Sequence, residues 1–192
     1  SRRVIYVCEP PNTEVVAERR CATEIIRAMA RRAFRRPVTS DEIESLLNFF
    51  DEGRRDGQSF DSGIQFALER ILVDPDFLLR VYRDPVDAES GQSPYELSDI
   101  ELASRLSFFL WSSIPDERLL ALAERGELSD PSTLEAETRR LLADPRATET
   151  LVNDFAAQWL NLRRVGEVVV DPRQYPTYDE TLLEAFVEEV ER

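Results

Sequence analysis

Residues 97–116 read LSDIELASRLSFFLWSSIPD, and this stretch decides the fold class. Ser98, followed three residues later by Glu101, is a capping box, which marks the start of a helix. Apolar residues then recur at helical spacing up to Trp111, and Pro115 ends the pattern. The stretch therefore predicts one short amphipathic helix with a defined start and a defined end.

The same pattern of short, capped helices extends in both directions along the chain. Thr39 and Glu42 form another capping box, and Asp-Pro pairs begin further helices because proline suits the first helical position behind an aspartate cap. We find no convincing strand pattern and expect an all-α protein, an irregular multi-helix bundle of about eight short helices. One expected helix begins at residue 40 and ends near Gly53 or Gly57. The others cover residues 14–34, 61–72, 76–82, 99–111, 117–124, 131–142, 145–160 and 178–192.

A segment rich in proline, glycine and serine separates two parts of the chain. We interpret residues 85–96 as a linker between a short N-terminal helical module at 1–84 and the start of a longer helical module at 97–192. The two modules are expected to meet through a shared apolar face. Because the last residues carry no helix stop signal, we expect the longer module to be truncated at Arg192.

The composition excludes several classes of catalytic chemistry. The 192 residues include 38 acidic and 24 basic side chains, for a net charge of −14, and every basic residue is an arginine. Without lysine or histidine, the chain alone cannot build a Schiff-base lysine, a Ser-His-Asp triad, or a histidine-ligated zinc or haem site. We assign no catalytic, cofactor-binding or metal-binding residue. No apolar run approaches the ~20 residues that span a bilayer, so no transmembrane segment is expected.

The positive charge is concentrated at the N-terminal end. Residues 1–36 contain nine arginines against four glutamates, whereas residues 37–192 are strongly acidic. The run at 31–36, RRAFRR, has the basic and aromatic composition of a nucleic-acid patch, but the acidic body would repel phosphates. We therefore predict that these arginines pair with carboxylates of the same chain and that no nucleic acid is bound.

Carboxylates are the acid–base groups that remain in number. Glu184 with Glu188, or Asp74 with Asp76, could in principle form the acid–base pair of a glycosidase. Such pairs also arise by chance in a chain with 38 acidic residues. Residues 51–61 are acidic and contain glycine, but they lack the alternating ligand spacing of an EF-hand. The carboxylates alone therefore assign no enzyme activity.

A family resemblance rests on residues 31–39, 72–80, 97–116, 140–146 and 153–160, of which 97–116 is the strongest segment. These segments resemble uncharacterised planctomycete-type tandem domains of unknown function, which occur in exported, c-type-cytochrome-associated bacterial proteins. The resemblance covers nearly the whole chain and implies a periplasmic or otherwise extracytoplasmic location. This chain has no Cys-x-x-Cys-His motif, so we expect no cofactor in the chain itself and haem c in a partner domain or chain.

Cys8 and Cys21 are the only cysteines of the chain. A disulfide between them would tie the N-terminal arm to the first long helix, and the export that the family resemblance implies would permit it. Two unrelated buried thiols are the alternative, because the cysteine count alone does not fix the pairing.

Aromatic side chains recur in the segments that carry the resemblance. We interpret Arg105, Trp111, Asp116 and Trp159 as a packing motif, with both tryptophans largely buried and Arg105 a candidate buried arginine paired with a carboxylate. A sugar-binding platform and an electron-transfer relay are the alternatives for the two tryptophans.

The last expected helix carries an apolar stripe of Leu182, Leu183, Phe186 and Val190. A helix of ~15 residues is marginal alone in water, so the stripe should be packed. We expect it to pack against the helix at 151–160 and to border an exposed apolar surface.

The favoured function is a non-catalytic helical scaffold or interaction module of an exported, cytochrome c-associated multidomain protein. Its partner would be another protein, a cytochrome c domain or the remainder of the same protein. The alternative is part of an extracytoplasmic oxidoreductase, or of a carboxylate-based polysaccharide-active enzyme, whose haem or catalytic site lies elsewhere. The lack of lysine and histidine favours the first interpretation, while participation in an enzyme stays open.

Overall fold

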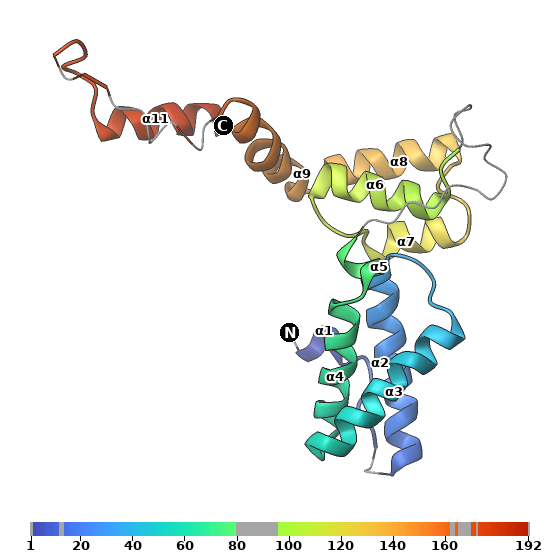
Figure 1. Ribbon diagram of the computed structural model, residues 1–192. Coiled ribbons are helices and arrows are strands. Elements are labelled where there is room, and N and C mark those ends of the chain that lie inside the picture. The colour runs from blue at the N-terminus through green and yellow to red at the C-terminus, as the bar shows by residue number, and fades with distance from the viewer. Residues whose placement is uncertain are drawn as a thin grey trace, which may run out of the picture.

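The computed structural model describes residues 2–11, 14–79, 96–161, 164, 170–171 and 173–191. Every regular element within these residues is a helix, which confirms the predicted all-α fold (Figure 1). The elements are α1 (Arg2–Ile5), α2 (Val15–Phe34), α3 (Ser40–Gly57), α4 (Phe60–Leu72), α5 (Pro75–Leu78), α6 (Asp99–Trp111), α7 (Glu117–Glu124), α8 (Pro131–Leu142), α9 (Pro145–Thr150), the π-helical segment η1 (Leu151–Ala156), α10 (Ala157–Trp159) and α11 (Glu180–Glu191). None of the described helices has both the length and the apolar character needed to cross a membrane. Most of the predicted linker at 85–96 lies outside the described residues.

The long helices α2, α3 and α4 pack side by side in the first module (Figure 1). α3 begins at the predicted capping box, in which Thr39 Oγ1 accepts from the backbone N–H of Glu42 while the Glu42 carboxylate accepts from the N–H of Thr39. The apolar faces of the three helices meet in a cluster that includes Phe50 and Ile64. Gly63 allows α3 and α4 to approach closely, because a Cβ atom at this position would lie 2.6 Å from the Phe50 ring.

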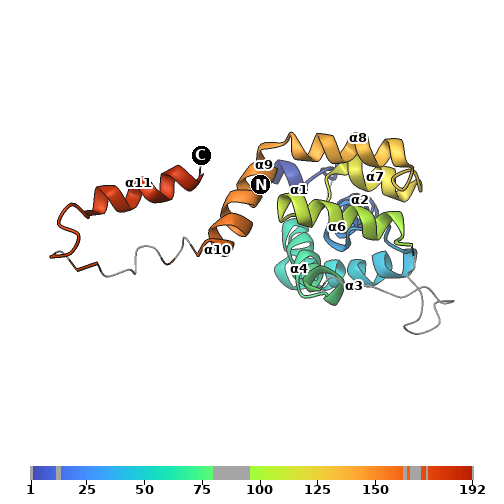
Figure 2. The ribbon, with the colours of Figure 1, turned by 90° about the horizontal axis from the view of Figure 1, so that it is seen from above.

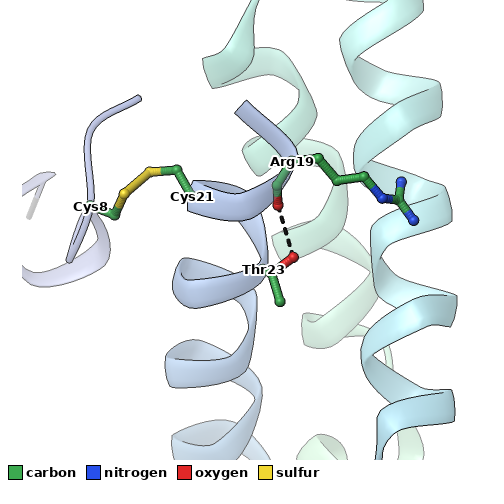
Figure 3. Close-up of a disulfide and its surroundings, with 4 residues drawn as sticks. All are labelled: Cys8, Arg19, Cys21 and Thr23. Carbon is green, nitrogen blue, oxygen red and sulfur yellow. Dashed lines mark hydrogen bonds between the residues drawn. A yellow bond between two sulfur atoms is a disulfide. The ribbon is translucent and has the colours of Figure 1, made fainter. Parts of the chain in front are cut away.

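Cys8 and Cys21 form a disulfide, which confirms the predicted bridge (Figure 3). Their Cα atoms are 5.5 Å apart, and Cys21 is 1% exposed within the first core. Figure 3 also shows Thr23 Oγ1, which donates to the carbonyl of Arg19, on the preceding turn of α2, at 2.8 Å. The bridge therefore attaches the N-terminal segment to the first turns of the central helix of this module.

The short helix α1 is not predicted by the sequence pattern. Arg2 Nη1 and the Tyr6 hydroxyl both donate to the carboxylate of Asp61 on α4, at 2.7 and 2.8 Å. Desolvation, together with the hydrogen bond to Asp61, raises the pKa of Tyr6 to about 12. A helix of four residues is too short to show a helical period, and it is held here by contacts that are distant in the sequence.

The helices α6, α7 and α8 form the second module around a separate core. α6 begins at the capping box of Ser98 and Glu101, as predicted. The carboxylate of Asp99 accepts from the backbone N–H of Leu128 at 2.6 Å, which fixes the turn between α7 and α8. The core of the described residues thus divides into two clusters, one in each module. The expected single apolar face shared by both modules is wrong in this respect.

Charged groups join the two modules where α2 meets α7 (Figure 1). Arg31 donates to both carboxylate oxygens of Glu124, at 2.7 and 2.9 Å, and to Glu117 at 2.7 Å. The hydrogen bond to Glu124 is the largest cause of a raised pKa of the Arg31 guanidinium, although desolvation opposes it. Arg36 pairs with Glu42 in the same way, so arginines of the basic run bind carboxylates of the same chain, as predicted.

The C-terminal helices extend away from the second module (Figures 1 and 2). Figure 2 shows α11 lying apart from α9 and α10, so the predicted packing of its apolar stripe on residues 151–160 is wrong. Phe186 of that stripe is 48% exposed. The apolar spacing shows that α11 has a face to cover, but it does not determine which surface covers that face.

The carboxylate of Glu42 is expected to stabilise the first module in a pH-dependent way. The hydrogen bond from Arg36 is the largest cause that lowers its pKa, from 4.5 to about 2, against desolvation and with help from Thr39. A lowered pKa in the folded state gives a stabilisation that is complete above the unfolded pKa of 4.5 and is lost as the pH falls to about 2. We expect Glu42→Gln to cost about 1–2 kcal/mol at neutral pH, after discounting for partial exposure, and much less in acid. Urea unfolding at a series of pH values measures this difference, and an equal cost at every pH would contradict it.

Candidate functional site

Charged groups surround Trp111, which is 4% exposed at the end of α6. Its indole Nε1 donates to the carbonyl of Leu141 at 3.0 Å and so joins α6 to α8. The guanidinium carbon of Arg146 lies 3.5 Å from the ring centroid, and that of Arg140 lies at 5.8 Å. A cation over the face of an indole ring is favourable because the ring carries negative charge on its faces. These contacts hold Trp111 in the second core, where it is inaccessible as a sugar platform.

Asp116 connects the start of α7 to α8. Its carboxylate accepts from the backbone N–H of Leu119 at 2.9 Å and from Arg140 at 2.8 and 3.2 Å. Burial opposes the ionisation of Asp116, but the hydrogen bonds from Arg140 and Leu119 outweigh it and lower its pKa. Asp116 is therefore an ionised anchor of the second module at neutral pH.

Glu137 completes this network, and the sequence reasoning missed it. Its side chain is 1% exposed and lies between Arg118, at 2.5 Å, and Arg140, at 2.7 Å. A buried carboxylate needs such partners because an unpaired charge in the interior is costly. The available signal was the spacing of three residues between Glu137 and Arg140, which also occurs on exposed helix faces.

The structure brings together two of the four residues interpreted as a packing motif. Trp111 and Asp116 share the guanidinium of Arg140. Arg105, in contrast, is exposed on α6, so its expected burial is wrong. The helical period places Arg105 on α6 but does not determine which side of the helix meets the core.

Trp159 is 73% exposed, so the expectation that it is buried is also wrong. The small Ala157 faces the interior instead, at 8% exposure. Trp159 belongs to a row of exposed apolar side chains, which we call the ridge: Leu151, Phe155, Trp159 and Leu160. The rings of Phe155 and Trp159 lie 5.7 Å apart between centroids.

The backbone beneath the ridge is π-helical over η1, which lies between α9 and α10. π-Helical turns are rare in proteins overall, and those that do occur often lie at functional sites. Ser112, directly after α6, donates from Oγ to Asp154 Oδ2 at 2.5 Å. This bond ties η1 to the second module, so the ridge is presented from a helix that is fixed at one end.

Several of the described carboxyl groups have a pKa that departs from its ordinary value. Those whose pKa departs from the ordinary value are all shifted downward by hydrogen bonds: Glu42, Asp61, Asp116, Glu127, Asp130 and Asp144. A glycosidase acid requires the opposite shift. Of the candidate acid–base pair on α5, Asp74 pairs with Arg70 at 2.9 Å and Asp76 pairs with Arg36. In the part of the chain that the structure describes, no three cysteine or acidic side chains are grouped to hold a metal ion.

Two family models match the chain, one in each module. Residues 21–81 match PSD5, described as a protein of unknown function (DUF1595), and residues 97–192, half of the chain, match PSD4, a protein of unknown function (DUF1592). No curated protein and no solved structure matches the chain. Both matches fall on segments that carry the resemblance seen in the sequence. The chain therefore belongs to the family of proteins of unknown function DUF1592, with a DUF1595 domain in tandem before it.

Proposed function

We propose that this chain is a non-catalytic helical interaction module of an exported, cytochrome c-associated protein. The observation that carries the proposal is the ridge, in which Leu151, Phe155 and Trp159 are 58%, 57% and 73% exposed. Contiguous exposed apolar side chains on a folded protein indicate an interaction site. Tryptophan is also among the residues that contribute most to the affinity of protein interfaces.

The ion-pair network supports a scaffold role for the rest of the chain. Arg31 holds α7 of the second module against α2 of the first. Arg140 holds α8 to the start of α7 through Asp116. Contacts of this kind fix the orientation of helices, and a fixed orientation reduces the entropy lost when a partner binds.

The cysteine chemistry supports the proposed location of the haem and of the protein. Cys8 and Cys21 are joined to each other, so neither is free to form a thioether bond to haem. We place any haem c in a partner domain or chain. The family resemblance supports this placement. A structural disulfide persists in oxidising compartments, which supports an extracytoplasmic location.

Photo-crosslinking from the ridge tests this proposal. A benzophenone side chain at position 159 of the full-length protein, activated in the cells that produce it, is expected to capture a neighbouring protein. Because haem c is covalently attached, a cytochrome in the crosslinked band would keep its haem stain on a denaturing gel. The same side chain at Phe109, which is 79% exposed on α6 but lies outside the ridge, is the matched control.

The expected result is a haem-stained product from position 159 and none from position 109. A crosslinked product without haem would support the role as an interaction module but would contradict the association with a cytochrome. Identical products from both positions, or no product from position 159, would contradict the role of the ridge.

A further inference from the structure

The junction between the two modules has a polar character. Each apolar cluster of the described residues contains side chains of one module only. Leu78 and Leu79, at the end of α5 beside the junction, are 62% and 60% exposed, so the second module leaves these apolar side chains uncovered (Figure 1). Domains that share no large hydrophobic interface are expected to move relative to each other. The orientation of the two modules therefore depends on the polar contacts between them.

Arg31 is the centre of these polar contacts. Its guanidinium reaches from α2 to Glu117 and Glu124, which lie seven residues apart and hence on the same side of α7. The side chains of Arg31 and Glu124 are 21% and 23% exposed, whereas that of Glu117 is 72% exposed. Leu120, between the two glutamates on this side of α7, is 2% exposed and belongs to neither apolar cluster. One buried leucine thus accompanies three charged groups at this contact.

Arg35 makes a second contact across the junction. Its guanidinium donates to the carbonyl oxygens of Asp76 and Leu79, at 2.5 and 3.1 Å, and is thereby fixed to α5 of the first module. Its guanidinium carbon lies 5.9 Å from the centroid of the Phe108 ring on α6. This distance is close to the limit of about 6 Å for a cation–π attraction. The contact with Phe108 therefore restricts orientation less than the two parallel hydrogen bonds between Arg31 and Glu124 do.

We propose that the ion pairs of Arg31 form a releasable latch between the two modules. When the latch is closed, α7 is held against α2, as in the structure. When the latch is broken, each module keeps its own core and the second module turns about the contact between Arg35 and Phe108. The charges favour the closed arrangement, because α2 carries five arginines against two glutamates and α7 carries two glutamates against one arginine. The latch does not involve the ridge, so this inference is independent of the partner proposed there.

Distance measurements by pulsed electron paramagnetic resonance on the intact chain test the latch. Ser45→Cys on α3 and Ala136→Cys on α8 place one spin label at an exposed position of each module. The two native cysteines do not react with the label because they are joined to each other. At low salt we expect one narrow distribution of distances. Added salt should broaden this distribution, since the pair with the exposed Glu117 is screened.

Arg31→Glu should lower the ratio of closed to open molecules about tenfold or more, because attractive contacts become repulsive. Combining Arg31→Glu with Glu124→Arg reverses both charges and should restore the narrow distribution. Urea unfolding of the same variants should show that both modules stay folded. If Arg31→Glu does not fold, Arg31→Gln removes the charge while keeping a long polar side chain and gives the same comparison.

Arg32→Glu is the matched control for Arg31→Glu. It makes the same change in charge at the next position of α2, where the arginine is exposed and forms no ion pair within the described residues. This variant should keep the narrow distribution. A wild-type distribution that is already broad at low salt would overturn the proposal. Equal broadening by Arg31→Glu and Arg32→Glu, no broadening by Arg31→Glu, or no recovery in the charge-reversed pair would overturn it as well.

Discussion

Glu137→Ala is expected to lower the free energy of unfolding of the second module by about 3–5 kcal/mol. Glu137 is 1% exposed and is bound by Arg118 and Arg140. Its removal leaves the partly buried guanidinium of Arg140 with one carboxylate instead of two, and it opens a cavity beneath α8. Urea unfolding followed by circular dichroism measures the change.

A matched control lies on the same helix. Glu135 and Arg139 form an exposed pair at 2.8 Å, with side chains that are 65% and 77% exposed. Glu135→Ala should therefore cost no more than about 0.5 kcal/mol, because both charges stay solvated. Glu137→Gln, which keeps the size of the side chain, should fall between the two. Equal effects of Glu135→Ala and Glu137→Ala would show that burial does not increase the contribution of the Glu137 ion pairs to the free energy of unfolding.

Most helix boundaries could be predicted because their signals are local. Ser98 is the N-cap of its capping box, and α6 begins at the next residue, Asp99. The helix ends at Trp111, where the apolar pattern in the sequence also ends. Asp130 caps α8 in front of Pro131, as the Asp-Pro pair indicates. A cap involves residues within one turn of each other, so its physics is contained in a few consecutive letters.

The orientation of the helices depends on tertiary contacts, and there the sequence reasoning was incomplete. The apolar residues at 151–160 have helical spacing on more than one face of the helix. In the structure, Ala157 faces the interior and Trp159 faces outward. Apolar periodicity indicates that a helix has a face to cover, but it does not state whether the same chain or another protein covers it. For the same reason, the predicted contact of α11 was not found.

The charge pattern gave a correct general prediction without the specific partners. The basic run was expected to bind carboxylates, and Arg31 does so with Glu124, 93 residues later in the chain. With 38 acidic residues to choose from, the sequence offers no means to select that one. The buried Glu137 was missed for a related reason, since burial of a charge is a property of the folded surroundings.

Removal of the disulfide, by Cys8→Ala with Cys21→Ala, is expected to cost about 3 kcal/mol in the free energy of unfolding. The bridge joins residues 13 positions apart, and the loss of such a loop restores conformational freedom to the unfolded chain. Because Cys21 is 1% exposed, its truncation adds a small cavity in the first core. Thermal unfolding with and without reductant separates the two effects: reduced wild type loses the bridge alone, and the double variant should not respond to reductant.

The non-covalent contacts of the N-terminal segment are expected to contribute less to stability than the disulfide does. A variant that removes one of these contacts is therefore the control for the cysteine variant. Arg2 and Tyr6 bind Asp61, but the side chains of Arg2 and Asp61 are 59% and 54% exposed, so solvent screens this ion pair. Tyr6→Phe, which removes one of these hydrogen bonds, should therefore cost about 1 kcal/mol, well below the double cysteine variant. If reduced wild type were as stable as the oxidised protein, these contacts would suffice to hold the N-terminal segment. If Tyr6→Phe cost as much as the loss of both cysteines, the hydrogen bond from Tyr6 to Asp61 would stabilise this end of the molecule as much as the covalent link does.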